Sequence, residues 1–226
     1  MLKPLSVQEK YKDFWWAAKK GEQRCVKGRR WGGHPILIVV DAVLDSIGLN
    51  YFQIVVPRVK RFYENCMKTA EITSFEDLSK LTPQDPGLRQ IIDNERVWKV
   101  AINISKELNR IKMEIGSESD FAALRFWAES VDLDKWREDA IGRINGVGLV
   151  TFQYLRMQAG VDTVVPDKII KRIVERDFNI KAENDMEFIK KLGEFSKETG
   201  YSQTLLCWAI WLKESNIKTS EWESVE

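Results

Sequence analysis

Two glycines and one acid carry the chemistry that this sequence suggests. Gly146 and Gly148 bracket Val147 in INGVGLVTF, and Asp167 follows nineteen residues after Gly148 in VVPDKIIKRIV. Glycine has no Cβ and adopts positive φ at little cost, so the amides around Val147 can approach a large anion at the start of a helix. A nucleic-acid phosphate is the natural anion for such a hairpin. A carboxylate beside it can stabilise the positive charge that develops on a sugar when its bond to a base breaks.

Asp167 also has an interpretation without chemistry. Pro-Asp before a helical run is an ordinary helix start, in which the carboxylate caps the amides of the turn that begins at Lys168. The two roles are compatible, because a capping side chain is directed outward from the helix start. Asp162 is the rival acid, but its interval from Gly148 is shorter and no helix is predicted directly behind it. Asp167 is therefore the first candidate and Asp162 the second.

Helices must position these groups. The apolar spacing predicts a helix over 149–159, directly behind the glycine hairpin, and a helical segment over 133–143 that leads into it. A basic helix is predicted to begin at Lys168. Its side chains Lys168, Lys171 and Arg172 are candidates for contacts with phosphates, which position a duplex without reading its sequence.

The rest of the chain also predicts helices. Apolar residues recur at helical spacing from Val97 to Ile111, which predicts the clearest amphipathic helix. The run 36–40 alone resembles a buried strand, but the apolar pattern continues to Ile47 and favours a buried helix. A first helix is predicted to begin after Ser6 and to end at Gly21, and another begins near Asn50. Ser74 and Asp77 form a predicted capping box at the start of a short helix, and Ser117 or Ser119 caps the next one. Two more helices are predicted over 186–197 and 202–214. The prediction is an all-α fold of roughly ten to twelve helices.

Composition indicates a globular protein with local basic patches. The 226 residues are 44% hydrophobic, and 35 Lys and Arg face 34 Asp and Glu, so the net charge neither favours nor excludes a polyanionic partner. The stretch from Lys19 to Arg30 contains six basic residues and one acid, Glu22. The glycine-rich loop in this stretch is either a solvated connector or a contact for phosphate, and the sequence leaves both open.

The sequence gives little support for a metal centre or a membrane-spanning segment. Cys25, Cys66 and Cys207 lie far apart without CxxC spacing, which suits reduced thiols rather than a disulfide framework or an iron–sulfur cluster. His34 is the single histidine, so a structural or pocket-lining role is favoured over metal binding or catalysis. No signal-peptide core or long apolar run is present, and we expect a cytoplasmic protein, associated with the nucleoid if the source is prokaryotic, with no membrane partner.

The combination INGVGLVTFQYLRMQAG and VVPDKIIKRIV resembles the helix-hairpin-helix DNA glycosylase superfamily. In that family a hairpin of the form L-P-G-V-G-x-K-T-A precedes an aspartate that opens the next helix. Matched residue by residue, Asn145, Gly146, Val147 and Gly148 fall on the hairpin, Thr151 on its threonine and Asp167 on the catalytic acid. A looser likeness extends from about Pro35 to Phe178.

The resemblance implies a two-lobed fold, with one lobe over about 36–130 and the other over 1–35 plus 131–226. It also implies a monomeric DNA N-glycosylase that flips a damaged or mispaired base out of duplex DNA and hydrolyses its bond to the sugar with the help of Asp167. Val150 stands where lyase-active members carry a Schiff-base lysine, which implies no lyase step. The resemblance implies that no cofactor is required, and by analogy with the family it implies a site for Na⁺ or K⁺ at the hairpin, on the carbonyls of Gly142, Ile144 and Val147.

The pocket for the flipped base is predicted from aromatic character. Its candidate lining residues are Trp16, His34, Tyr51 and Trp208, although Trp208 is favoured for packing over base stacking. Ile47 is a candidate wedge for the gap that the base leaves. Two other functional classes remain open: a non-catalytic helix-hairpin-helix module that only binds DNA, and an interaction protein in which the hairpin is structural.

Overall fold

The computed structural model describes residues 6–215, and within them all regular structure is helical. The α-helices are α1 Val7–Lys10, α2 Lys12–Val26, α3 Pro35–Asp45, α4 Val56–Phe62, α5 Phe75–Lys80, α6 Pro86–Ile91, α7 Glu95–Glu114, α8 Asp120–Ser130, α9 Leu149–Gln158, α10 Lys168–Phe178, α11 Asp185–Thr199 and α12 Gln203–Glu214. These twelve α-helices, without a strand among the described residues, confirm the all-α prediction. In the same range, no helix is both long and apolar enough to cross a membrane.

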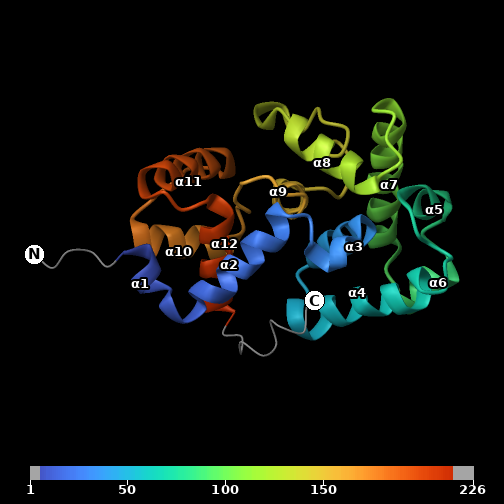
Figure 1. Ribbon diagram of the computed structural model, residues 1–226, viewed down its shortest axis with the longest axis horizontal. Coiled ribbons are helices and arrows are strands. Elements are labelled where there is room, and N and C mark those ends of the chain that lie inside the picture. Colours follow the sequence, from blue (N-terminus) through green and yellow to red (C-terminus); the bar gives the residue numbers. More distant parts are fainter. Residues whose placement is uncertain (1–5, 216–226) are drawn as a thin grey trace, which may run out of the picture.

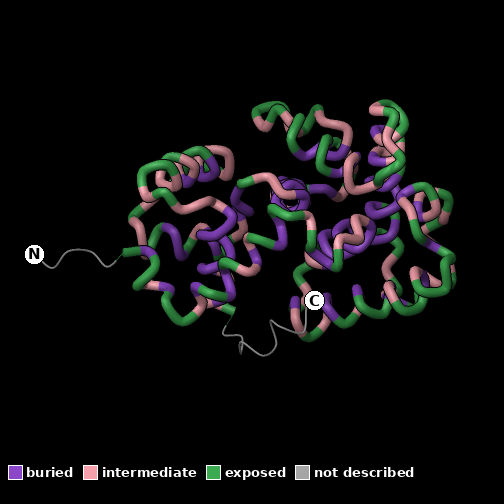
Figure 2. Tube along the Cα trace, in the orientation of Figure 1, coloured by how far each residue is buried: buried purple, intermediate pink, exposed green. Residues whose placement is uncertain are grey.

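The helices gather at two ends of the molecule. In Figure 1, α1 and α2 from the N-terminal part lie beside α10, α11 and α12, and α2 packs directly against α12. Helices α3 to α8 occupy the other end, and α9 lies between the two groups. Figure 2 shows that α9 is buried, whereas much of α11 is exposed. This arrangement accords with two lobes, whose boundaries stay a prediction.

Helix α3 forms the core where a strand was the alternative. Every residue from Ile36 to Leu44 is buried, and Pro35 stands at the helix start, where its missing N–H costs nothing. A helix that is apolar on all faces is stable only inside the protein. The prediction of a buried helix is therefore confirmed, and one acid, Asp41, is enclosed with it at 0% exposure.

Two local predictions were wrong. Helix α2 does not end at Gly21 but continues to Val26, because Gly21 packs against the Trp208 indole, where a Cβ would lie 2.8 Å from a ring atom. The segment before the hairpin is a series of turns with one short 3-10 helix, Leu133–Lys135, rather than an α-helix. Asp139 holds these turns by accepting hydrogen bonds from the amides of Ile141 and Gly142 at 2.8 and 3.2 Å.

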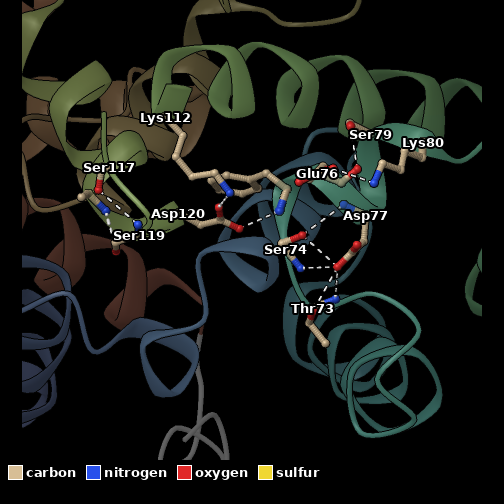
Figure 3. Close-up of polar contacts among 12 residues, drawn as sticks. Thr73, Ser74, Glu76, Asp77, Ser79, Lys80, Lys112, Ser117, Ser119 and Asp120 are labelled. Carbon is tan, nitrogen blue, oxygen red and sulfur yellow. Dashed lines mark hydrogen bonds and ion pairs between the residues drawn. The ribbon is translucent and has the colours of Figure 1, made fainter. Parts of the chain in front are cut away.

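The junction of α5, α7 and α8 shows how side chains define helix starts (Figure 3). Ser74 and Asp77 form the predicted capping box at the start of α5. Asp120, in the first turn of α8, accepts a hydrogen bond from the Phe75 amide at 2.6 Å and pairs with Lys112 of α7 at 2.8 Å. One carboxylate therefore ties three helices together on the side away from α10 and α12.

Candidate functional site

The glycine hairpin leaves the start of α9 open. Gly146 adopts φ +106°, and the position of a Cβ there would lie 2.6 Å from a methyl group of Val100, so α7 supports the hairpin from one side. The Val147 amide closes the turn by donating to the Ile144 carbonyl at 2.9 Å. Gly148 is the exposed N-cap of α9, has no side-chain cap and has no atom within 4 Å in the direction of its missing Cβ. The first amides of α9 are thus positioned for an anion.

Asp167 caps α10, as one of its two predicted roles required. One carboxylate oxygen accepts a hydrogen bond from the Ile170 amide at 2.7 Å. The side chain is only partly buried, and this burial raises the pKa of Asp167 above its ordinary value. Capping does not hide the carboxylate, because Asp167 also lines a cleft.

A cleft of about 1340 Å³ brings the hairpin and Asp167 together. Its walls come from the end of α3, the π-helical turn Tyr51–Val55, the hairpin, α9, the start of α10 and α12. The lining residues include Asp45, Tyr51, Gly146, Val147, Gly148, Thr151, Asp167, Lys168 and Trp208. The volume exceeds that of one nucleobase, and the cleft is open to solvent.

The predicted phosphate contacts divide into two groups. Thr151, Lys168 and Lys171 line the cleft, and Lys168 is exposed without an ion pair among the described residues. Lys171 is already paired with Asp185. Arg172 does not line the cleft, because its guanidinium lies on another face of α10, 3.8 Å from Glu214. Asn145 is exposed just before the hairpin glycines.

Two of the predicted base-pocket residues are elsewhere. Trp16 lies on the solvent side of α2, 55% exposed, and His34 precedes α3 with its ring 5.6 Å from that of Tyr63, so neither lines the cleft. Tyr51 and Trp208 do line it. Ile47 is 39% exposed at the rim, between the lining residues Ser46 and Gly48, and its role as a wedge stays a prediction.

Aromatic rings form one wall of the cleft. The rings of Phe52 and Trp211 are stacked at 5.3 Å, and Tyr51 meets Trp211 edge-on at 5.2 Å. Trp208 is 4% exposed and contacts Trp211 edge-on at 5.6 Å, which agrees with its predicted packing role. The wall offers flat apolar surfaces to a planar ligand.

Asp162, the second-choice acid, has a structural function. It is exposed, and its carboxylate accepts a hydrogen bond from the Thr204 amide at 2.9 Å, which fastens the start of α12. It does not line the cleft. Of the two acids that the sequence predicted, only Asp167 therefore lines the cleft.

A buried network behind the cleft was missed by the sequence analysis. One Asp41 carboxylate oxygen accepts hydrogen bonds from Trp31 at 2.8 Å, Tyr154 at 3.0 Å and Tyr51 at 3.2 Å, and it pairs with Arg30 at 3.5 Å. Tyr51 and Tyr154 also line the cleft, so the network holds part of its wall. The available signal was an acid inside the apolar run ILIVVDAVLD, because such an acid needs buried partners.

Asp45 is a second missed residue, one helical turn after Asp41. It lines the cleft and is partly buried. Burial, together with the negative charges of Asp41 and Asp167, raises the pKa of Asp45 to about 7. At neutral pH this carboxyl group can hold or release a proton, a property that the flanking sequence alone does not reveal.

The hairpin carbonyls are compatible with the predicted cation. The Ile144 carbonyl already accepts the Val147 amide, but a carbonyl oxygen has a second lone pair. Gly142 is held in place by Asp139, and a Cβ at Gly142 would lie 1.7 Å from the Trp136 carbonyl oxygen. In residues 6–215, no cluster of three His, Cys, Asp or Glu side chains is arranged to hold a metal ion. The Na⁺ or K⁺ site stays a prediction.

Comparison with solved structures identifies the class of fold. The chain is similar to the structure described as "Crystal structure of Tm1821, the 8-oxoguanine DNA glycosylase of Thermotoga maritima", with a TM-score of 0.50 and 14% identity over 92% of this chain and 91% of that chain. The molecule therefore has the all-helical fold of a DNA glycosylase. Residues 16–215 match the family described as "Domain of unknown function (DUF8548)", and the chain belongs to this family. No curated protein matches the chain.

Proposed function

We propose that this protein is a DNA N-glycosylase that removes a damaged or mispaired base from duplex DNA without a lyase step. One observation carries the proposal: the Asp167 carboxylate and the hairpin of Gly146 to Gly148 line the same cleft. An anion-binding backbone and an acid are thus placed on one opening, as required when a nucleotide held by its phosphates must present its sugar to a carboxylate.

Binding begins at the hairpin. The open amides at the start of α9 hold a phosphate, which the positive end of the helix dipole also favours, and Lys168 adds a charge beside it. A Na⁺ or K⁺ on the carbonyls of Gly142, Ile144 and Val147 would bridge to the same phosphate. The target nucleotide leaves the stack and enters the cleft, while Ile47 at the rim fills the gap in the duplex.

The chemistry is hydrolysis of the bond between base and sugar. The bond breaks with its electron pair going to the base, and the Asp167 carboxylate stabilises the positive charge left on the sugar. Asp167 also orients the water that adds to the sugar carbon and accepts the proton that this water loses, so that the products are the free base and an abasic site. Asp45 supports this step, since its raised pKa of about 7 lets it carry a proton for the departing base at neutral pH.

Val150 supports the proposal that there is no lyase step, because it lines the cleft at the position where the superfamily that the sequence resembles carries a Schiff-base lysine. An uncharged aliphatic side chain has no amine to attack the sugar. We propose that the protein acts as a monomer, since hairpin, acid and cleft all come from one chain.

The test is incubation with duplexes that each carry one modified or mispaired base, scored for abasic sites after alkali. We expect excision of at least one base, lost in Asp167→Asn with DNA affinity retained. The matched control is Asp134→Asn, which makes the same change at an exposed carboxylate near Lys190. Binding without cleavage across the panel would favour a non-catalytic DNA-binding module. DNA affinity that is absent or insensitive to salt would favour an interaction protein.

A further inference from the structure

A second hollow lies at the end of α2, outside the cleft. Its volume is about 540 Å³, and its lining residues are Lys20, Gln23, Arg24, Lys27, Arg29, Trp31 and Gly32. We call it the basic groove. It contains most of the basic residues between Lys19 and Arg30, which the sequence allowed either as part of a solvated connector or as contacts for phosphate. The proposed excision reaction does not use this groove.

The basic groove is lined by positive charge, and three of its cations form no ion pair with the described part of the chain. Four of its lining residues are Lys or Arg and none is acidic. Lys20, Lys27 and Arg29 have no ion pair among residues 6–215, and the neighbouring acid Glu22 is bonded to Ser202 instead. Cations that are concentrated in one place without acidic partners attract polyanions, and phosphate is the biological anion that several such side chains hold together.

The wall of the basic groove is held in an unusual conformation. Trp31 has φ 53°, in the left-handed region that a bulky residue rarely adopts, and Gly32 continues it at φ +65°. The Trp31 indole donates to the buried Asp41 at 2.8 Å, which keeps this turn in place. Such local strain persists only where surrounding contacts impose it, so the groove has a fixed shape.

An exposed aromatic ring stands beside the basic groove. Trp16 is 55% exposed, one helical turn before Lys20 on α2, and the Lys20 ammonium lies 4.0 Å from the centre of its ring. The cation covers one face and leaves the rest of the ring to solvent. Exposed aromatic rings next to basic grooves are the pattern by which proteins hold unpaired strands, since bases stack on the rings while phosphates follow the charges.

The basic groove is separate from the hairpin. The end of α2 meets Gly160, just after α9, where a Cβ would lie 3.2 Å from the Cys25 carbonyl oxygen. The hairpin precedes the opposite end of α9, a ten-residue helix that spans about 15 Å. A ligand in the groove therefore need not touch the hairpin.

We propose that the basic groove binds a segment of single-stranded nucleic acid, with phosphates held by Lys20, Lys27 and Arg29 and one base stacked on Trp16. This site goes beyond the proposed function, because it lies outside the cleft and requires no excision. Its ligand class follows from the combination of an exposed indole with three cations that form no ion pair among residues 6–215.

The test measures binding of a fluorescent oligo-dT of about a dozen nucleotides by anisotropy, with inorganic polyphosphate as a second ligand that has charge but no bases. The variants are Lys27→Gln/Arg29→Gln and Trp16→Ala. Lys106→Gln/Lys197→Gln is the charge-matched control, because both lysines are exposed and lack an ion pair among the described residues. Gly148→Glu places a negative charge at the hairpin instead.

We expect Lys27→Gln/Arg29→Gln to weaken oligo-dT and polyphosphate at least about tenfold, since it removes two phosphate contacts. Trp16→Ala should weaken oligo-dT about tenfold and leave polyphosphate unchanged. The proposal is overturned if Lys27→Gln/Arg29→Gln and the charge-matched control bind oligo-dT with equal affinity. It is also overturned if Gly148→Glu is the only variant that loses oligo-dT binding. Wild-type oligo-dT binding in Trp16→Ala overturns the assignment to nucleic acid. Base excision from duplexes is measured in a separate assay. A protein that excises no base would therefore still give a clear result in these binding measurements.

Discussion

Gly148 and Asp167 are the N-caps of two successive long helices, α9 and α10, and both line one cleft. Gly148 has no side chain to accept a hydrogen bond from the first amides of α9, whereas one carboxylate oxygen of Asp167 accepts a hydrogen bond from the Ile170 amide in the first turn of α10. The cleft therefore receives an open, positive helix start and an acid from neighbouring elements. The predictions below separate what each residue does for stability from what it does for binding or chemistry.

The capping and chemical roles of Asp167 can be separated by two substitutions. Asn caps a helix about as well as Asp, whereas Ala costs about 1 kcal/mol at such a position. We expect Asp167→Asn to unfold at the wild-type urea midpoint and Asp167→Ala to unfold earlier. Both should lose excision by about 100-fold or more, because each removes the charge beside the sugar. If Asp167→Asn excised bases at the wild-type rate, Asp167 would have only a helix-capping role.

The open space at Gly148 makes it a clean position for testing the hairpin. Gly148→Ala should bind duplex DNA like the wild type, since its φ of −95° suits any residue and a Cβ meets nothing within 4 Å. Gly148→Glu should weaken binding about tenfold, because it sets a negative charge where a phosphate is held. Anisotropy titrations at two salt concentrations measure both. Equal affinities for the two variants would place the duplex elsewhere.

Gly146 is confined both by its backbone and by its neighbour. Gly146→Ala is expected to destabilise the fold by about 1–3 kcal/mol, because φ +106° disfavours an L side chain and the new methyl would meet Val100 at 2.6 Å. In a Val100→Ala background the same substitution should cost less, since the clash is relieved. Urea denaturation of the four variants in this cycle gives both values. Additive costs would show that the contact with α7 is unimportant.

Asp45 is expected to make stability depend on pH. Its pKa rises from 3.8 to about 7 in the folded protein, so the folded state holds a proton that the unfolded state has released. The free energy of unfolding should therefore fall as pH rises from about 4 to about 7. Asp45→Asn should flatten this slope, measured by urea denaturation across that range. An unchanged slope in the variant would assign the effect to another group.

Asp41 is expected to dominate the stability of the cleft wall. Asp41→Asn replaces a fully buried carboxylate and breaks its ion pair with Arg30, and breaking a buried ion pair typically costs about 3–5 kcal/mol. Asp93→Asn breaks an exposed pair with Arg89 and is the matched control, for which we expect no measurable change. Thermal unfolding compares the two. Similar melting temperatures would mean that the buried network contributes little.

Local chemistry determined most helix positions directly from the sequence. Ser74 and Asp77 form the expected capping box, and the regular apolar spacing after Val97 produces α7. The hairpin followed by Asp167 likewise pointed to a cap and a carboxylate at one helix start. These features depend on residues a few positions apart, whose geometry the backbone period sets.

The tertiary structure alone decided which side chains share the cleft. Tyr51, Asp167 and Trp208 come from distant segments, and their meeting depends on how the π-helical turn Tyr51–Val55, α10 and α12 pack. The same packing turned Trp16 outward and carried α2 through Gly21. A periodic pattern tells which face of a helix is buried but not which partner covers it, because that partner lies far away along the chain.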